Sequence, residues 1–155
     1  MPHFALVDAA RDPMIYPMVR DEAQSQCLFG GKIDPVMNDV VPYIVRLDPG
    51  SRFRQALEGY GWANYWGITC YAPERMLNVR RELRKNLQAR LPDGRAVLFR
   101  FYDPRVWVPF ITSSSGEELD PWFDLIETYW APHPKTGATM MFTREDGALV
   151  AKAAA

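Results

Sequence analysis

Hydrophobic and polar positions alternate most clearly in the segment 96–102, where the odd-numbered side chains are all apolar and Arg100 stands between them. A period of two is typical of a β-strand with one buried face, so we expect a core strand over 96–102. Asp103 and Pro104 follow directly and predict the start of a helix. The aspartate can accept hydrogen bonds from free amide groups, and proline is well tolerated at the first helical position.

Shorter apolar runs, bounded by glycine, proline or aspartate, predict further β-strands. They lie at residues 4–7, 26–29, 43–47, 66–71, 128–131 and 138–143. Asp146 and Gly147 predict one more turn near the end of the chain. The final residues, AKAAA, are expected to fray.

The longest helix is predicted after Pro73, because Met76, Val79, Leu83 and Leu87 recur at helical spacing. This helix lies between two predicted strands, and a β-α-β order predicts that part of the sheet is parallel. We therefore expect an α/β (α+β) fold, a single compact domain with a mixed sheet of about five to seven strands flanked by helices. Shorter helices are predicted to begin near the cap residues Asp12, Ser51, Asp103 and Asp120.

The chain has 155 residues, a length that fits one domain. Its formal net charge of −1 predicts no general attraction to nucleic acid or anionic membranes. We expect a main domain over 1–130 and a C-terminal strand and tail over 131–155 that completes it. No window is long and apolar enough for a signal peptide or a membrane span, so a cytoplasmic location is expected.

Few residues in the sequence suit catalysis or cofactor binding. His3 and His133 lie apart from any cysteine or carboxylate at a metal-ligand spacing, and we expect no metal and no other cofactor. Cys27 and Cys70 fall in apolar segments and are expected to remain free thiols. No phosphate-binding loop or nucleophile motif is present, so we do not expect an enzyme.

The predicted helix after Pro73 carries a basic face that includes Arg80, Arg81 and Arg84. This face is either simply solvated or a docking site for an acidic protein surface. Nucleic acid fits less well, because the helix lacks interleaved aromatic side chains. Trp107 and Trp122 lie near the ends of predicted elements, where tryptophan serves either as rim packing or as an apolar anchor for a partner.

Asp103 is flanked by Arg100 and Arg105, which are close enough in sequence to share its carboxylate through charge-assisted hydrogen bonds. Such a cluster can pin the corner between strand and helix. Alternatively, it can form a surface that a partner reads or an anion-binding site.

Several motifs in order along the chain resemble the DUF4123 family. The most specific is LFRFYDPRVW, preceded by the basic segment RRELRKNL and the turn LPDG. FALVDAARDPMIYP, CLFGG, VPYIVRLDPGS and WGITCYA are similar to earlier parts of the family pattern. The resemblance covers roughly residues 4–130.

The resemblance implies an adaptor chaperone of type VI secretion, which holds an effector protein in the cytoplasm and helps to load it onto the VgrG spike. It implies no catalysis and no membrane or nucleic-acid partner. On this hypothesis Arg80, Arg81 and Arg84 steer an acidic partner surface, and Trp107 or Trp122 supplies the apolar anchor.

Two other classes remain open. One is a small-molecule or anion-binding domain, or an enzyme, that uses Arg100, Asp103 and Arg105. The other is a structural subunit of the same secretion machine. Many members of the family also carry a longer region after the core. Either the partner-specific part is reduced here to 122–143, or the core itself binds the partner.

Overall fold

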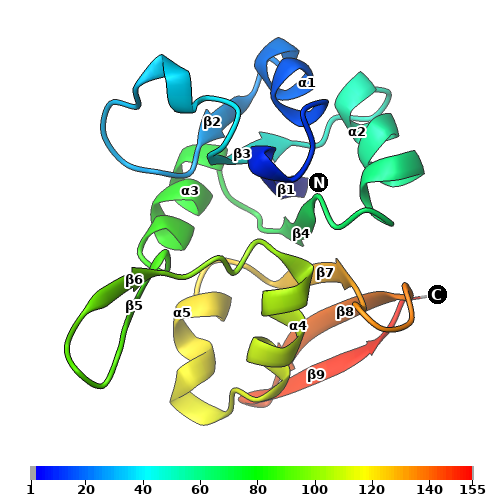
Figure 1. Cartoon of the computed structure of the whole chain (residues 1–155). Helices are drawn as coiled ribbons and strands as arrows, with labels where there is room; N and C mark the ends of the chain where they lie inside the picture. The colour runs from blue at the N-terminus through cyan, green and yellow to red at the C-terminus, as the bar shows by residue number, and fades with distance from the viewer. Residues whose placement is uncertain (1–2, 155) are drawn as a thin grey trace.

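The computed structural model describes residues 3–154 and has the element order shown in Figure 1. The strands are β1 (His3–Asp8), β2 (Ser25–Cys27), β3 (Pro42–Arg46), β4 (Gly67–Tyr71), β5 (Gln88–Arg90), β6 (Ala96–Leu98), β7 (Thr128–Pro132), β8 (Thr139–Glu145) and β9 (Ala148–Ala153). The helices are α1 (Ile15–Asp21), α2 (Arg52–Ala56), α3 (Met76–Arg84), α4 (Pro104–Thr112) and α5 (Asp120–Phe123). Short helical turns are η1 (Ala9–Arg11), η2 (Pro35–Met37), η3 (Leu57–Gly61) and η4 (Gly116–Leu119).

Seven strands form one sheet in the order β2-β3-β1-β4-β7-β8-β9, and this confirms the predicted α+β fold class. Each strand pair described in the sheet is antiparallel, so the prediction of partly parallel pairing is wrong. The reason is that β4 already has β1 and β7 as neighbours. After α3 the chain therefore leaves the sheet instead of adding a parallel strand to it.

The segment 96–102 is not the predicted core strand. Only Ala96–Leu98 is extended, as β6, and it pairs with β5 in a separate two-stranded hairpin. Beyond it the chain turns, with the Asp103 amide donating to the Arg100 carbonyl at 3.1 Å. Phe101 and Tyr102 are nevertheless buried, because their side chains enter the main core from this turn. Residues 96–98 are thus exposed and residues 101–102 are buried, so the alternating pattern does not correspond to one strand with a buried face.

The sheet packs against helices on both faces in its N-terminal half. On one face, Phe53 of α2 and Ile15 and Val19 of α1 cover Val7 and Val45. On the other face, α3, α4 and α5 contribute to a larger cluster that also contains side chains of β1, β4, β7 and β8. In Figure 1, α4 lies against the strands β7, β8 and β9, and α5 lies beside α4.

Predicted turn and cap residues are confirmed at several points. Ser51 caps α2 by accepting from the Arg54 amide at 3.0 Å, and Asp103 caps α4 with Pro104 in the first turn. Asp146 and Gly147 have positive φ of 52° and 79° and form the two-residue turn between β8 and β9. Such turns match the twist of a hairpin.

The prediction of a frayed C-terminus is wrong for part of the chain. Residues 151–153 belong to β9, which pairs along its length with β8. The tight turn at residues 146–147 explains this, because it holds the second strand in register beside the first. Ala155, the last residue of the predicted frayed end, lies outside the described residues.

Candidate functional site

The start of α4 holds the Asp103 cluster in a different arrangement from the predicted one. Asp103 accepts from Arg105 through two separate oxygens, from Nε at 3.0 Å and from Nη2 at 2.7 Å, as well as from its backbone amide. Arg100 pairs instead with Asp8, at the end of β1, so the prediction that both arginines share Asp103 is wrong. Asp8 reaches this corner because β1 ends beside the chain that leads into α4.

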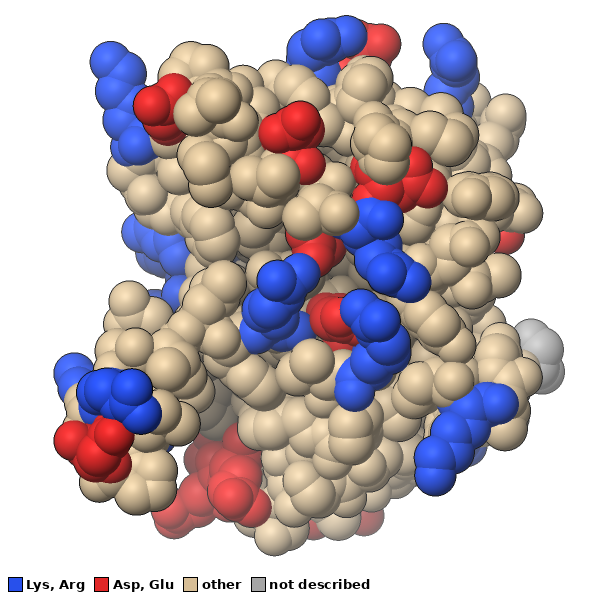
Figure 2. Space-filling model, in the orientation of Figure 1, with Lys and Arg blue, Asp and Glu red and all other residues tan. Residues whose placement is uncertain are grey.

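Burial and neighbouring charges both act on the pKa values of the groups at this corner. Burial acts to raise the pKa of Asp103, but the hydrogen bonds and charge of Arg105, with the charge of Arg100, outweigh it and the pKa is lowered. Tyr102 lies beside the Arg100 guanidinium, and burial, followed by the charge of Asp8, raises the pKa of its hydroxyl to about 12. Figure 2 shows basic and acidic side chains gathered in the middle of the visible face.

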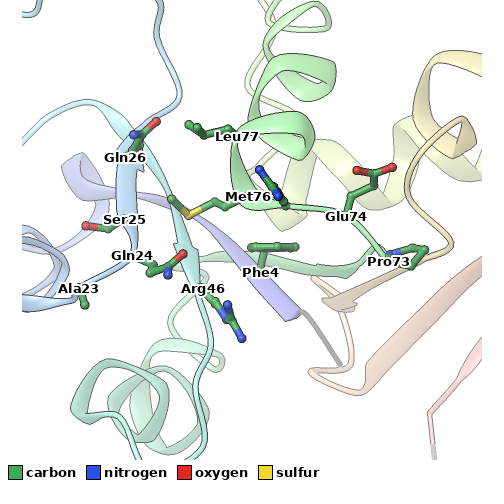
Figure 3. Close-up of a pocket in the computed structure, with 11 residues that line it drawn as sticks. Phe4, Ala23, Gln24, Ser25, Gln26, Arg46, Pro73, Glu74, Met76 and Leu77 are labelled. Carbon is green, nitrogen blue, oxygen red and sulfur yellow. The ribbon is translucent and has the colours of Figure 1, made fainter.

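Two carboxylates meet two guanidinium groups here, so the corner has no excess positive charge. The hollow shown in Figure 3 and those beside α1, α2 and β6 are lined by other residues. The arrangement can fix the junction of β1 and α4. It does not supply a free cation over a cavity, as an anion site would require.

The arginines of α3 have separate roles. Arg80 donates to the backbone carbonyls of Cys27 at 2.6 Å and Phe29 at 2.9 Å, and it therefore ties α3 to β2. Arg84 packs over Gly30, and neither Arg81 nor Arg84 forms an ion pair among residues 3–154. Two of the three predicted arginines thus keep charges that form no ion pair within the described residues.

The two tryptophans predicted as apolar anchors are core residues. Trp107 has no exposed surface and Trp122 is 4% exposed. Their rings lie 5.3 Å apart between α4 and α5, and the Trp107 ring also packs on Tyr129 of β7. An anchor for a partner needs an exposed ring, so the prediction that Trp107 or Trp122 supplies it is wrong. Both rings point from α4 and α5 into the core cluster over the sheet.

Exposed apolar side chains occur instead on the β5–β6 hairpin. Val97 and Leu98 are 38% and 48% exposed, and with Phe29 and Leu87 they line a hollow of about 450 Å³. Arg84 stands at its rim. Sequence reasoning missed this surface, although the turn at residues 92–94 between two short extended runs is a hairpin signal.

A larger open groove, of about 760 Å³, lies between β2 and the start of α3. Figure 3 shows Met76 reaching from the helix toward the strand, with Phe4 nearby. Glutamine and serine side chains of 24–26 and Arg46 form its polar side. The lining mixes apolar side chains and neutral polar groups with the charged residues Arg46, Glu74 and Arg75. An open groove with this mixed lining suits a polypeptide surface better than a small metabolite. The sequence analysis did not identify it.

The described residues offer few groups for a metal site or for thiol chemistry. No three histidine, cysteine, aspartate or glutamate side chains within residues 3–154 come together as metal ligands. Cys27 and Cys70 are both free thiols, and burial raises the pKa of each. Among the described helices, none combines the length and apolar character needed to cross a membrane.

Residues 3–120 match the family described as Domain of unknown function (DUF4123). The chain belongs to the DUF4123 family. No curated protein and no solved structure matches it.

The DUF4123 match covers α3, the β5–β6 hairpin and the Asp103 corner. It also covers the groove beside β2 and the hollow lined by Val97 and Leu98. Strands β7, β8 and β9 lie beyond the matched residues, yet β7 pairs with β4 and continues the same sheet. This DUF4123 protein therefore joins three strands from outside the family match to the sheet of the matched region.

Proposed function

We propose that this DUF4123 protein is an adaptor chaperone of type VI secretion, which binds an effector in the cytoplasm and helps to load it onto the VgrG spike. The observation that carries the proposal is membership of the family, together with the adaptor role that the resemblance implies. The surface features of the fold support binding of a protein.

The proposed contact surface is the side formed by α3 and the β5–β6 hairpin. Arg81 and Arg84 supply charges that are free to attract an acidic surface, which raises the rate of association. Val97 and Leu98 supply apolar surface in place of the buried tryptophans. A mixed surface of this kind, with an apolar centre and a charged rim, is typical of transient protein interfaces.

We also propose that the protein acts without catalysis. The charged residues at the Asp103 corner are engaged with one another, and both arginines are accounted for by a carboxylate. An adaptor needs a surface that binds and releases its cargo, whereas an enzyme needs acid, base or nucleophilic groups that face a substrate.

The proposal is tested by affinity purification of the tagged protein from its native bacterium, identification of the captured effector, and reconstitution with the purified effector and VgrG. We expect a complex whose affinity falls as salt increases. The double variant R81E/R84E should weaken effector binding by about tenfold or more, because it reverses two exposed positive charges of α3.

The matched control is R52E/K135E, which changes the net charge by the same amount at exposed positions away from α3. Its affinity should stay near that of the wild type. Equal binding by all three proteins, with no dependence on salt, would contradict the proposed surface. Failure of the purified protein to bind effector or VgrG would contradict the adaptor function.

A further inference from the structure

The two edges of the sheet differ in how their backbone groups are used. At the β2 edge, the Leu28 amide donates inward to the Pro42 carbonyl, and the Gln24 carbonyl accepts from the Arg46 amide of β3. Hydrogen bonds of an antiparallel pair belong to alternate residues, so Cys27 and Phe29 point their carbonyls outward.

Both of those outward carbonyls are occupied. Arg80 donates to Cys27 and Phe29, and the Phe29 amide donates to the Cys27 sulfur at 3.3 Å. The strand itself is only three residues long. A short strand capped by an arginine is protected against pairing with another chain.

The β9 edge has no such protection. The Ala154 amide donates inward to the Thr139 carbonyl at 2.8 Å, which sets the alternation along the pair. Leu149, Ala151 and Ala153 therefore point their amides and carbonyls away from β8. No hydrogen bond of these outward groups is found within residues 3–154.

The sequence of β9 carries little of the usual protection, a single lysine. Its six residues, ALVAKA, contain no proline and one charge, Lys152. Natural edge strands are normally short, charged, bulged or interrupted by proline. The hairpin turn at residues 146–147 holds β9 extended beside β8, so its outward groups already have the spacing of a strand.

We propose that the β9 edge binds an extended segment of a partner protein, which adds an eighth strand to the sheet. A row of alternating outward amides and carbonyls is complementary to the backbone of another strand, and main-chain hydrogen bonds supply the affinity in this mode. Leu149 faces the α4 and α5 side, and the opposite side carries Val150 and Lys152. The segment is therefore apolar where it lies beside Leu149, and an acidic residue fits opposite Lys152.

A second copy of this chain is a poorer occupant. Pairing of β9 with itself would bury a few hundred Å², well below the roughly 1,200 Å² of stable protein interfaces. Two Lys152 side chains would also lie on the same face of such a pair. A longer extended segment can continue onto the sheet face that carries Trp130 and Met141, which are both partly exposed.

The inference deepens the proposed function and rests on it for the partner's identity, because the segment would belong to the effector. The binding mode itself can be tested without the effector. The probe is a short blocked peptide of alternating valine and threonine, and its matched control carries N-methyl groups on alternate residues. N-methylation removes the donors of one edge and leaves the side chains unchanged.

Amide hydrogen exchange by NMR gives the readout at single residues. In the free protein, the amides of Leu149, Ala151 and Ala153 should exchange fast, whereas those of Val150 and Lys152 are protected by β8. The peptide should slow exchange of the three outward amides by about tenfold or more at saturation. The N-methylated peptide should have no effect on them.

The variant Ala151→Pro removes one outward donor and leaves the hydrogen bonds to β8 in place, since edge strands accept proline. It should abolish the protection by the peptide and keep the wild-type melting temperature. Ala151→Thr retains the amide and should bind as the wild type does. If the peptide leaves the outward amides unprotected, or binds Ala151→Pro equally well, the proposal is wrong.

Sedimentation of the protein alone tests the second copy. Dimerisation that protects the same three amides would overturn the assignment to a partner segment. With reconstituted effector, Ala151→Pro should lose binding about tenfold or more, since the added strand relies on this edge. An effector that still binds Ala151→Pro tightly leaves the adaptor function standing and overturns the edge proposal. If the peptide binds and no effector does, the edge proposal stands and the adaptor function is overturned.

Discussion

The two halves of the sheet differ in how many of their faces are covered. In the N-terminal half, β1 and β3 are buried along almost their whole length, because helices pack on both sides. In the C-terminal half, burial alternates in β7, and Phe142 is the one fully buried residue of β8. The alternation arises because α4 and α5 cover one face of these strands. The other face, called the open face below, is covered in part, where the Trp62 indole donates to Thr139 of β8, and it keeps partly exposed side chains.

This difference explains the patterns seen in the sequence. A continuous apolar run such as Phe4 to Val7 corresponds to a strand covered on both faces, whereas alternation corresponds to cover on one face. The N-terminal half forms a closed layer. The C-terminal half keeps partly exposed side chains and the β9 edge, at which we propose that a partner segment binds.

The largest effect should come from Gly67→Ala, which challenges the closed half directly. A Cβ atom at this position would lie 1.9 Å from the Leu6 carbonyl oxygen, inside the β1–β4 pair. We expect destabilisation of about 3 kcal/mol or more, since backbone would have to move. Denaturant unfolding measures it.

Gly59→Ala is the matched control for that experiment. Nothing lies within 4 Å of a Cβ atom at Gly59, which sits in the helical turn η3. Its stability should stay within about 1 kcal/mol of the wild type, on the stabilising side. A similar loss for both variants would mean that the close approach of β1 and β4 is not the cause.

Asp103→Ala should have the next largest effect, because it acts where the two halves meet. The change removes the α4 cap and leaves Arg105 without its carboxylate, and we expect a loss of about 2 kcal/mol in the free energy of unfolding. Asp103→Asn keeps a capping oxygen and should cost less. An unchanged melting temperature in Asp103→Ala would show that the corner does not support the fold.

The pH dependence of the wild type should reflect the same residue. The pKa of Asp103 is lowered in the folded state, so its contribution is present above the ordinary carboxylate pKa and is lost as the pH falls toward the folded value. Asp103→Asn should show a smaller loss of stability in acid than the wild type. Equal acid profiles of the two proteins would contradict this assignment.

Val45→Thr and Val150→Thr compare the two halves through one chemical change. Val45 of β3 has no exposed surface, whereas Val150 of β9 is partly exposed on the open face. The buried hydroxyl should cost about 2 kcal/mol at Val45, and less than about 0.5 kcal/mol at Val150. Thermal or denaturant unfolding of both variants decides it, and equal losses would show that the open face is covered in solution.

The smallest effect concerns the indole N–H groups of the two cores. Trp66 donates to Asp12 at 3.3 Å, but Trp107 Nε1 is buried and has no hydrogen-bond partner among residues 3–154. Replacement by phenylalanine removes the same atoms at both sites, so Trp66→Phe should cost about 1 kcal/mol more than Trp107→Phe. The order of the two unfolding midpoints tests this, and the reverse order would mean that Trp107 has a partner in solution.

Part of the candidate site could be predicted from the sequence. The basic face of α3 and the capping role of Asp103 depend on residues close together in the chain, and both are present. The partner of Arg100 could not be predicted, because Asp8 is 92 residues away. The exposure of Val97 and Leu98 could not be predicted either, since their alternation is the same in a core strand and in a hairpin outside the sheet.

Local sequence by itself determined the α+β class, the caps at Ser51 and Asp103 and the tight turn at residues 146–147. The caps and the turn depend on interactions within a few residues, and the α+β class follows from the mixture of helical and strand patterns along the chain. The tertiary structure alone decided that the pairing is antiparallel, that Trp107 and Trp122 are buried, and that Arg80 closes one sheet edge while β9 leaves the other open. Those outcomes depend on which distant segments become neighbours, and hydrophobic periodicity carries no information about that choice.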